Sequence, residues 1–312
     1  MMMKWTKKLA TGITVGAMML SIVGCSSSSS SGGSVLEQIA SRGTLKVGVS
    51  ENKLGFALEN TKTGKLDGLE IMISKQIAKD IAKKEKVDKI DVDFTKVNAK
   101  TRTSMLDEGT LDFSAASVTI TQERAKSWNF SSSYFNDPVS VMTKKGAFPT
   151  GVKGFKDKGS KVIIGVLLGT TSKDALIKYA KETLGLTDFE NNVEFKEFNT
   201  NDEVLIALDS GVVDGYCCDY TQLFAYKTNK YEILGETVGD NFDPQPLGII
   251  TRYKTATDGE DKEFTAFIQS EIKKFWKSGQ MNKWFKACGY PSQKAPTDLD
   301  LKYGPYYHGK SE

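Results

Sequence analysis

The side chains that most often perform catalytic or metal chemistry are scarce in this chain. It has one histidine, His308, and four cysteines at positions 25, 217, 218 and 288. A zinc site needs a set of His, Cys or acidic ligands, and a Ser-His-Asp triad needs a histidine beside its nucleophile. We therefore expect neither a zinc site nor a histidine-based catalytic site, no other metal and no cofactor.

Two polar positions follow apolar runs that have the length of strands. Asp219 ends the run 215–218, where an unpaired carboxylate would be costly. The segment Gly169-Thr170-Thr171-Ser172 separates the apolar run 162–167 from residues 174–176, which is typical of a helix start with free N–H groups that favour an anion. No Gly-Lys-Thr/Ser follows it, so it is not a nucleotide-binding P-loop.

The cysteines do not form an obvious disulfide framework. Cys217 and Cys218 are adjacent, and a disulfide between neighbours is strained. The pattern favours buried, reduced thiols on a strand.

Length and composition describe a globular chain. The 312 residues are 26% charged and 39% hydrophobic with seven prolines, which suits roughly two domains. Without Lys4, Lys7 and Lys8 of the N-terminal leader, the 42 basic residues fall to 39, equal to the 39 acidic ones. A neutral body has no net attraction to a phosphate backbone, so we expect no nucleic-acid partner.

The first residues have the pattern of a secretory signal peptide. Lysines precede an apolar stretch, 9–23, that is shorter than the ~20 residues of a membrane-spanning helix. Ile22-Val23-Gly24-Cys25 resembles the lipobox of bacterial lipoproteins, which implies that 1–24 is removed and that Cys25 carries lipid. Residues 25–34 then form a serine-rich tether. The alternative is a secreted protein with an incidental cysteine.

Strand-like and helix-like patterns alternate along the body. The segments 45–49, 90–97 and 162–167 read as strands, and apolar residues recur at helical spacing through 73–81. This alternation predicts an α/β fold, and two such series suggest two lobes with a cleft. Aromatic residues at helical spacing between 264 and 285 are expected in the core.

Several ordered motifs resemble family 3 of the bacterial extracellular solute-binding proteins, the amino-acid receptors of ABC importers. The resemblance covers about 35–290, and Met72 departs from it, since an acid is usual there. The motifs are Gly68-Leu69-Glu70-Ile71, Leu106-Asp107-Glu108-Gly109-Thr110-Leu111-Asp112, Thr119-Ile120-Thr121-Gln122-Glu123-Arg124, Phe130-Ser131 with Tyr134, and the segment 211–219.

The resemblance implies a two-lobed, type II periplasmic-binding-protein-like α/β fold with the ligand held between the lobes. Two crossovers are expected, near 137–141 and 246–250. The implied domains are a signal peptide at 1–24, a lipidated tether at 25–34, a first lobe formed by 35–137 and 249–312, and a second lobe at 138–248.

The resemblance also implies how an amino acid is bound. A closed cleft must pair both charges of the ligand, because each unpaired ion would suffer a desolvation cost of several kcal/mol. Arg124 corresponds to the family's ligand for the α-carboxylate, which its planar fork can meet with two bonds. Ser117, Thr119, Thr170 and Thr171 would assist it. Asp219 corresponds to the acid that binds the α-ammonium.

Lys53 and Arg102 resemble the subgroup that binds glutamate and aspartate, in which two cations hold the side-chain carboxylate. With Arg124, these residues place three cations against the one acid Asp219, a surplus that favours an acidic ligand. Asn201 stands where some of this subgroup has a tyrosine, and its amide could equally serve an amide side chain. Glutamine therefore remains an alternative.

The implied function is that of a monomeric lipoprotein on the outer face of the bacterial cell membrane. It would capture glutamate or aspartate, deliver it to an ABC permease and perform no reaction. The alternatives are a glutamine or cystine receptor of the same family, or an enzyme resembling periplasmic cyclohexadienyl dehydratases. Such an enzyme needs an acid or base that is not paired with the ligand's ammonium, and the sequence marks none.

Overall fold

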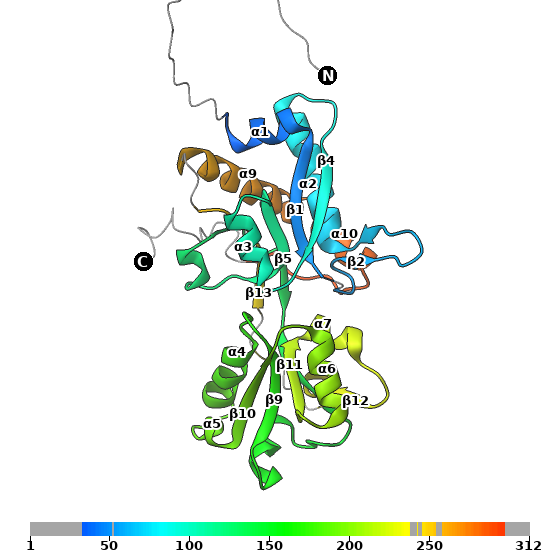
Figure 1. The fold of residues 1–312 in the computed structure, drawn as a ribbon, viewed down its shortest axis with the longest axis vertical. Helices are drawn as coiled ribbons and strands as arrows, with labels where there is room; N and C mark the ends of the chain where they lie inside the picture. Colours follow the sequence, from blue (N-terminus) through cyan, green and yellow to red (C-terminus); the bar gives the residue numbers. More distant parts are fainter. Residues whose placement is uncertain (1–32, 52, 238–241, 243–244, 254–257, 297–312) are drawn as a thin grey trace, which may run out of the picture. The chain divides into compact units, whose positions relative to one another are not determined.

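A computed structural model describes residues 33–51, 53–237, 242, 245–253 and 258–296 (Figure 1). The signal peptide predicted at 1–24, Cys25, most of the serine-rich tether and His308 lie outside these residues. Among the helices that are described, none is both long and apolar enough to cross a bilayer.

The first sheet has the strand order β4-β1-β5-β13-β6, and β7 also pairs with β13. Strands β4, β1 and β5 are parallel, whereas β13 runs antiparallel to β5. The bounds are β1 Thr44–Ser50, β4 Asp91–Val97, β5 Phe113–Thr119, β6 Asn129–Phe130, β7 Phe135–Asp137 and β13 Gln245–Thr251.

Helices cover the first sheet because their apolar side chains recur every third or fourth residue. In helix α2, the side chains of Leu69, Ile73, Ile77 and Ile81 are fully buried. They belong to one apolar cluster with side chains of the first sheet. The aromatic residues expected in the core between 264 and 285 pack into the same cluster. The helices are α1 Val35–Arg42, α2 Leu69–Glu85, α3 Thr101–Asp107, α9 Asp258–Lys277 and α10 Gln280–Ala287.

The second sheet has the order β10-β9-β11-β8-β12. Its faces alternate along β11, since Cys217 packs with one apolar cluster and Tyr216 and Cys218 pack with another. The elements are β8 Val139–Lys144, β9 Val162–Leu167, α4 Ser172–Lys178, α5 Phe189–Asn192, β10 Val193–Phe198, α6 Asn201–Ser210, β11 Gly215–Asp219, α7 Tyr220–Tyr226, β12 Tyr231–Ile233 and α8 Leu234–Thr237.

Short elements complete the described chain. Strands β2 and β3 form a small hairpin beside the start of α2. These elements are β2 Leu58–Glu59, β3 Leu66–Asp67, η1 Arg124–Lys126, η2 Gly151–Lys158 and η3 Tyr179–Thr183.

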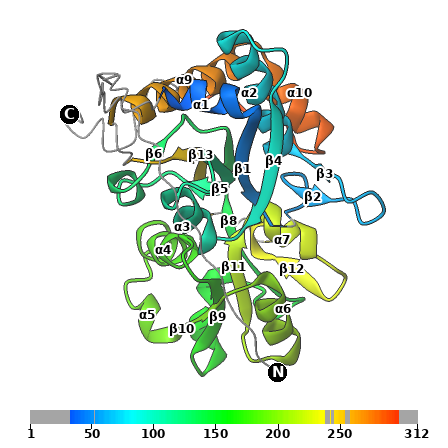
Figure 2. The same cartoon turned by 45° about the horizontal axis from the view of Figure 1, so that its top comes forward.

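The chain passes between the two sheets at two places (Figure 2). Asp137 ends β7 in the first sheet and Val139 begins β8 in the second, so the first crossing lies at Pro138. The second crossing precedes Gln245, where β13 begins in the first sheet. The boundary expected after residue 248 falls inside this strand, because its pairing with β5 and β7 holds all of β13 in the first sheet. We call 33–137 with 245–296 the first lobe, and 139–237 the second lobe.

Candidate functional site

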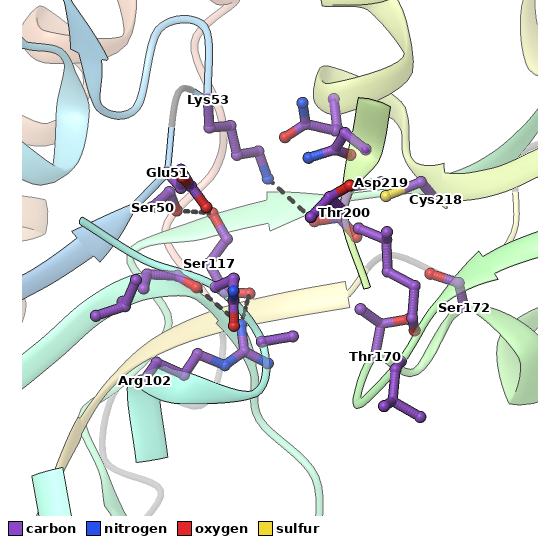
Figure 3. Close-up of a pocket in the computed structure, with 18 of the residues that line it drawn as sticks. Ser50, Glu51, Lys53, Arg102, Ser117, Thr170, Ser172, Thr200, Cys218 and Asp219 are labelled. Atoms are coloured by element: carbon purple, nitrogen blue, oxygen red, sulfur yellow. Dashed lines mark hydrogen bonds and ion pairs between the residues drawn. The ribbon is translucent and has the colours of Figure 1, made fainter. Parts of the chain in front are cut away.

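A pocket of about 230 Å³ is lined by side chains of both lobes (Figure 3). It is smaller than the ~300–1,000 Å³ typical of pockets for drug-sized ligands, and so suits a small molecule. All nine residues predicted to bind a ligand line it: Lys53, Arg102, Ser117, Thr119, Arg124, Thr170, Thr171, Asn201 and Asp219.

Arg124 connects the two lobes at one side of the pocket. It begins the short helix η1 after β5, and its Nη1 donates to the carbonyl of Thr119 at 2.9 Å. Its Nη2 donates to the carbonyl of Gly169 in the second lobe, also at 2.9 Å. Burial lowers the pKa of Arg124, and Asp219 opposes this effect. The guanidinium is thus held by neutral carbonyl groups.

Arg102 projects from α3 and is 7% exposed. Its Nη1 donates to the carbonyl oxygens of Ala116 at 2.8 Å and Ser117 at 3.3 Å. Burial and the nearby charge of Arg124 lower its pKa to about 9. Within the described residues, neither Arg102 nor Arg124 forms an ion pair with a carboxylate. Two guanidinium groups therefore face one pocket with only neutral hydrogen-bond partners.

Lys53 differs from the two arginines because it lies between two carboxylates. Its Nζ is 3.0 Å from Asp219 of the second lobe and 3.1 Å from Asp137 of the first lobe. Burial alone would lower its pKa, but Asp219 and Asp137 outweigh burial and raise it. Asp137, in turn, accepts hydrogen bonds from the backbone N–H and the hydroxyl of Thr221. Lys53 is predicted to hold a carboxylate of the ligand, but in this structure its ammonium is paired with two carboxylates of the protein itself.

Glu70 forms a buried polar centre in the first lobe, behind the pocket. Its carboxylate accepts bonds from the backbone N–H and hydroxyl of Ser50, at 2.9 and 3.0 Å. It accepts the same two bonds from Ser117, at 2.8 and 3.0 Å, and another from the Tyr134 hydroxyl at 3.0 Å. Burial raises the pKa of Glu70, although these donors oppose the effect. Ser117 has a φ of 49°, a left-handed conformation that is rare for a serine and is held here by Glu70.

The second lobe contributes hydroxyl groups and an amide. The Thr171 hydroxyl donates to Gln245 at 3.1 Å and lies 3.4 Å from the Thr119 hydroxyl, whereas the Thr170 hydroxyl donates to the Leu167 carbonyl. At the start of α6, the Oδ1 of Asn201 accepts a bond from the Tyr216 hydroxyl at 2.6 Å. This bond fixes the amide, so that its NH₂ group is the part left to meet a ligand.

The two adjacent cysteines are buried thiols in β11, as their sequence context favours, and both are free. Burial raises the pKa of Cys218, which lines the pocket, to about 12 and that of Cys217 well above its ordinary value. A thiol that keeps its proton is a poor nucleophile. Over the described part of the chain, no three His, Cys, Asp or Glu side chains gather where they could hold a metal ion.

Sequence reasoning assigned no role at the site to Asp137 or Glu70. Glu70 carries a weak signal, since it is an acid between the apolar residues Leu69 and Ile71 of α2. Asp137 stands directly before Pro138 at the end of a strand, which alone indicates a turn. Its partner Lys53 lies in the same lobe, in the loop after β1, and no local pattern links the two positions.

Comparison with known proteins identifies the family. Residues 45–287 match the model of the bacterial extracellular solute-binding proteins, family 3. A glutamine-binding protein of Geobacillus stearothermophilus is 35% identical over 226 residues, 72% of this chain and 78% of the relative. A glutamate/aspartate import solute-binding protein of Salmonella typhimurium is 25% identical over 301 residues, 95% of this chain and 93% of the relative.

A solved structure confirms the predicted fold. The crystal structure of an ancestral amino acid-binding protein, described as a precursor of cyclohexadienyl dehydratase, is 25% identical and superposes with a TM-score of 0.64. It covers 82% of this chain and 99% of its own. The fold is that of the type II periplasmic binding proteins, as predicted, although the second crossing precedes β13 and does not lie within 246–250. The chain therefore belongs to the bacterial extracellular solute-binding proteins of family 3, as the resemblance of its motifs indicates.

Proposed function

We propose that this protein is the receptor of an amino-acid ABC importer and that its ligand is glutamate or aspartate. The observation that carries the proposal is the pair of guanidinium groups, Arg102 and Arg124, which face one pocket without a carboxylate partner among the described residues. A ligand with two carboxylates would give each of them one.

The α-carboxylate and the α-ammonium of the ligand would each bind to a different lobe. Arg124 would take the α-carboxylate with the hydroxyl groups of Thr119 and Thr171, and Asp219 would take the ammonium. Arg124 lies in the first lobe and Asp219 in the second, so a ligand that pairs with both favours the closed protein over the open one.

The side-chain carboxylate is assigned to Arg102. Burial and the charge of Arg124 lower the pKa of this guanidinium, and among the described residues it has only carbonyl hydrogen-bond partners, so a ligand carboxylate would stabilise its charged form. The NH₂ group of Asn201 would donate a further bond from the opposite lobe. Asp137 pairs with Lys53 and so reduces the surplus of positive charge counted from the sequence, which leaves Arg102 as the cation that lacks a carboxylate near the side chain of the ligand.

Glutamine is a second candidate, and a separate observation favours it. The relatives named as glutamine-binding are 33–35% identical to this chain, whereas those named for glutamate and aspartate in Salmonella and Escherichia coli are 25% identical. With Lys53 paired to two acids, an amide side chain would leave only Arg102 uncompensated.

The leader completes the proposal. We infer that Cys25 carries lipid and tethers the body to the outer face of the cell membrane, beside the permease that receives the amino acid. Release of the body by a lipase, or radiolabelling with palmitate that is lost in Cys25→Ala, would test this inference.

The proposal is tested by thermal unfolding of the body from residue 35 onward with each of the twenty amino acids, after refolding from denaturant to remove carried-over ligand. At one hundred times Kd, a ligand adds ~2.7 kcal/mol to the free energy of unfolding, which raises the Tm by several degrees. We expect a rise with glutamate or aspartate. A rise with glutamine alone would establish the second candidate. No rise with any amino acid, together with turnover of prephenate, would establish the enzyme alternative.

A further inference from the structure

The ammonium of Lys53 already occupies the position that the proposed function assigns to the ammonium of the ligand. Figure 3 shows the side chain reaching from the loop after β1 towards Asp219 across the pocket. Its Nζ lies at a hydrogen-bonding distance of 3.0 Å from Asp219, and the residue is only 3% exposed. A ligand ammonium bound to Asp219 would need the same space.

This position is built by several fixed groups rather than by one surface ion pair. The Nζ of Lys53 also lies 3.1 Å from Asp137 and 4.4 Å from the centre of the Phe56 ring. Asp137 is fully buried and is held by Thr221 at the start of α7. Lys53 can therefore give up Asp219 and keep a carboxylate partner and an aromatic face.

We propose that Lys53 is a built-in substitute for the ligand's ammonium, so that the pocket also accepts dicarboxylates that have no amine. This inference rests on the proposed function, because it takes Asp219 as the ammonium site and the two arginines as the carboxylate sites. An amino acid displaces Lys53 from Asp219 towards Asp137. A dicarboxylate of the same length leaves Lys53 in place and pairs its two carboxylates with Arg102 and Arg124.

Removing Lys53 should have opposite effects on the affinity for amino acids and on the affinity for amine-free dicarboxylates. For an amino acid, Lys53 is a competitor, so its removal strengthens binding. For an amine-free dicarboxylate, Lys53 neutralises Asp219, so its removal leaves repulsion between Asp219 and the ligand. If Lys53 instead held the side-chain carboxylate of the ligand, its removal would weaken both ligands together.

The experiment is calorimetric titration of the wild type and of Lys53→Met with L-glutamate and with glutarate, which has the same five carbons and two carboxylates but no amine. We expect glutarate to bind the wild type more weakly than glutamate. In Lys53→Met we expect glutamate to bind about threefold or more tightly and glutarate about tenfold or more weakly. Parallel changes for the two ligands, or an unchanged glutarate affinity, would overturn the inference.

A double variant keeps the test informative if Lys53→Met alone fails to fold. Lys53→Met leaves Asp137 buried without its cation, whereas Lys53→Met with Asp137→Asn removes both charges of that pair. The same opposite changes are expected in the double variant.

The wild-type titrations separate the two proposals. Binding of amino acids without glutarate would overturn the inference and leave the proposed function in place. Binding of glutarate without any amino acid would overturn the proposed function, because Lys53 would then belong to a dicarboxylate site and would not replace a ligand ammonium. Binding of neither class would overturn both.

Discussion

The Nη2 of Arg124 in the first lobe donates a hydrogen bond of 2.9 Å to the carbonyl oxygen of Gly169 in the second lobe. The same guanidinium holds the Thr119 carbonyl through Nη1. Its planar fork is therefore fixed at the lobe junction, beside Thr170 and Thr171 in the lining of the pocket. A group held in this way is pre-oriented for a carboxylate that arrives between the lobes.

Arg124→Lys should weaken the binding of every amino-acid ligand by about 10- to 100-fold. A lysine offers a point charge where the guanidinium offers two aligned donors, and a lost charged hydrogen bond is worth ~1.5–3 kcal/mol. Calorimetric titration measures the change. Arg42→Lys is the matched control, because Arg42 pairs with Asp112 away from the pocket. An unchanged Kd in Arg124→Lys would remove this residue from the binding site.

Arg102→Gln should separate acidic from amide ligands. We expect glutamate and aspartate to bind about 100-fold more weakly, because a side-chain carboxylate left buried without its partner costs ~2–5 kcal/mol. Glutamine should lose less than about tenfold. Competition titrations with the three amino acids measure the ratio, and Lys100→Gln, an exposed position two residues earlier, is the control. An equal loss for all three ligands would place Arg102 outside the side-chain pocket.

Gly68→Ala should destabilise the protein by about 2–4 kcal/mol, measured by urea unfolding. Gly68 has a φ of 130°, and a Cβ there would lie 2.4 Å from the carbonyl oxygen of Phe56. Gly64 in the neighbouring hairpin turn is the control. Its φ of 66° is also left-handed, but a Cβ would approach only Glu59, at 3.8 Å, so we expect a cost of ~1 kcal/mol. Equal costs would show that the contact with Phe56 relaxes freely.

Asp137 should make stability depend on pH between about 4 and 6. Burial raises its pKa from 3.8 to about 6, while Lys53 opposes the rise and Asp219 adds to it. The folded state therefore binds a proton that the unfolded state releases, and the stability from this group is present below pH 4 and lost as the pH rises through 6. Asp137→Asn cannot ionise, so its free energy of unfolding should gain about 2–3 kcal/mol relative to the wild type between pH 4 and 7.

Urea unfolding of both proteins at several pH values between 4 and 7 tests this dependence. Asp174→Asn, at an exposed position on α4, is the control and should follow the wild type. A constant difference between Asp137→Asn and the wild type across this range would contradict the assigned direction.

Much of the fold is predictable because apolar periodicity decides which face of each element is buried. The segment predicted as a strand at 162–167 is β9, and the segments 45–49 and 90–97 agree with β1 and β4 to within one residue at each end. The repeat of Ile73, Ile77 and Ile81 identifies α2, but the helix extends well beyond it, from Leu69 to Glu85. At the C-terminal end Lys83, Lys84 and Glu85 are charged, so the apolar repeat stops there although the helix continues, and at the N-terminal end the closely spaced Leu69 and Ile71 obscure the repeat.

The sequence predicts which of the site residues lie close together, but it does not predict how their charges pair. The nine residues named from motifs meet in one pocket, because each motif lies where a strand ends or a helix begins. The partners of Lys53 cannot be predicted from the sequence. Asp137 is 84 residues away and Asp219 is 166 residues away, and no local pattern states that both carboxylates face one ammonium. The pairing of these buried charges depends on the tertiary fold, which places Asp137 at the end of β7 and Asp219 at the end of β11 beside the loop that holds Lys53.

The position of Glu70 has a kinetic consequence. It ties the ends of β1 and β5 together through Ser50 and Ser117, and all of these groups belong to the first lobe. The first lobe's half of the site is therefore assembled before the second lobe closes. Ligand encounter should depend on this rigid half, so that changes at second-lobe residues such as Asp219 alter the residence time of the ligand more than its association rate constant.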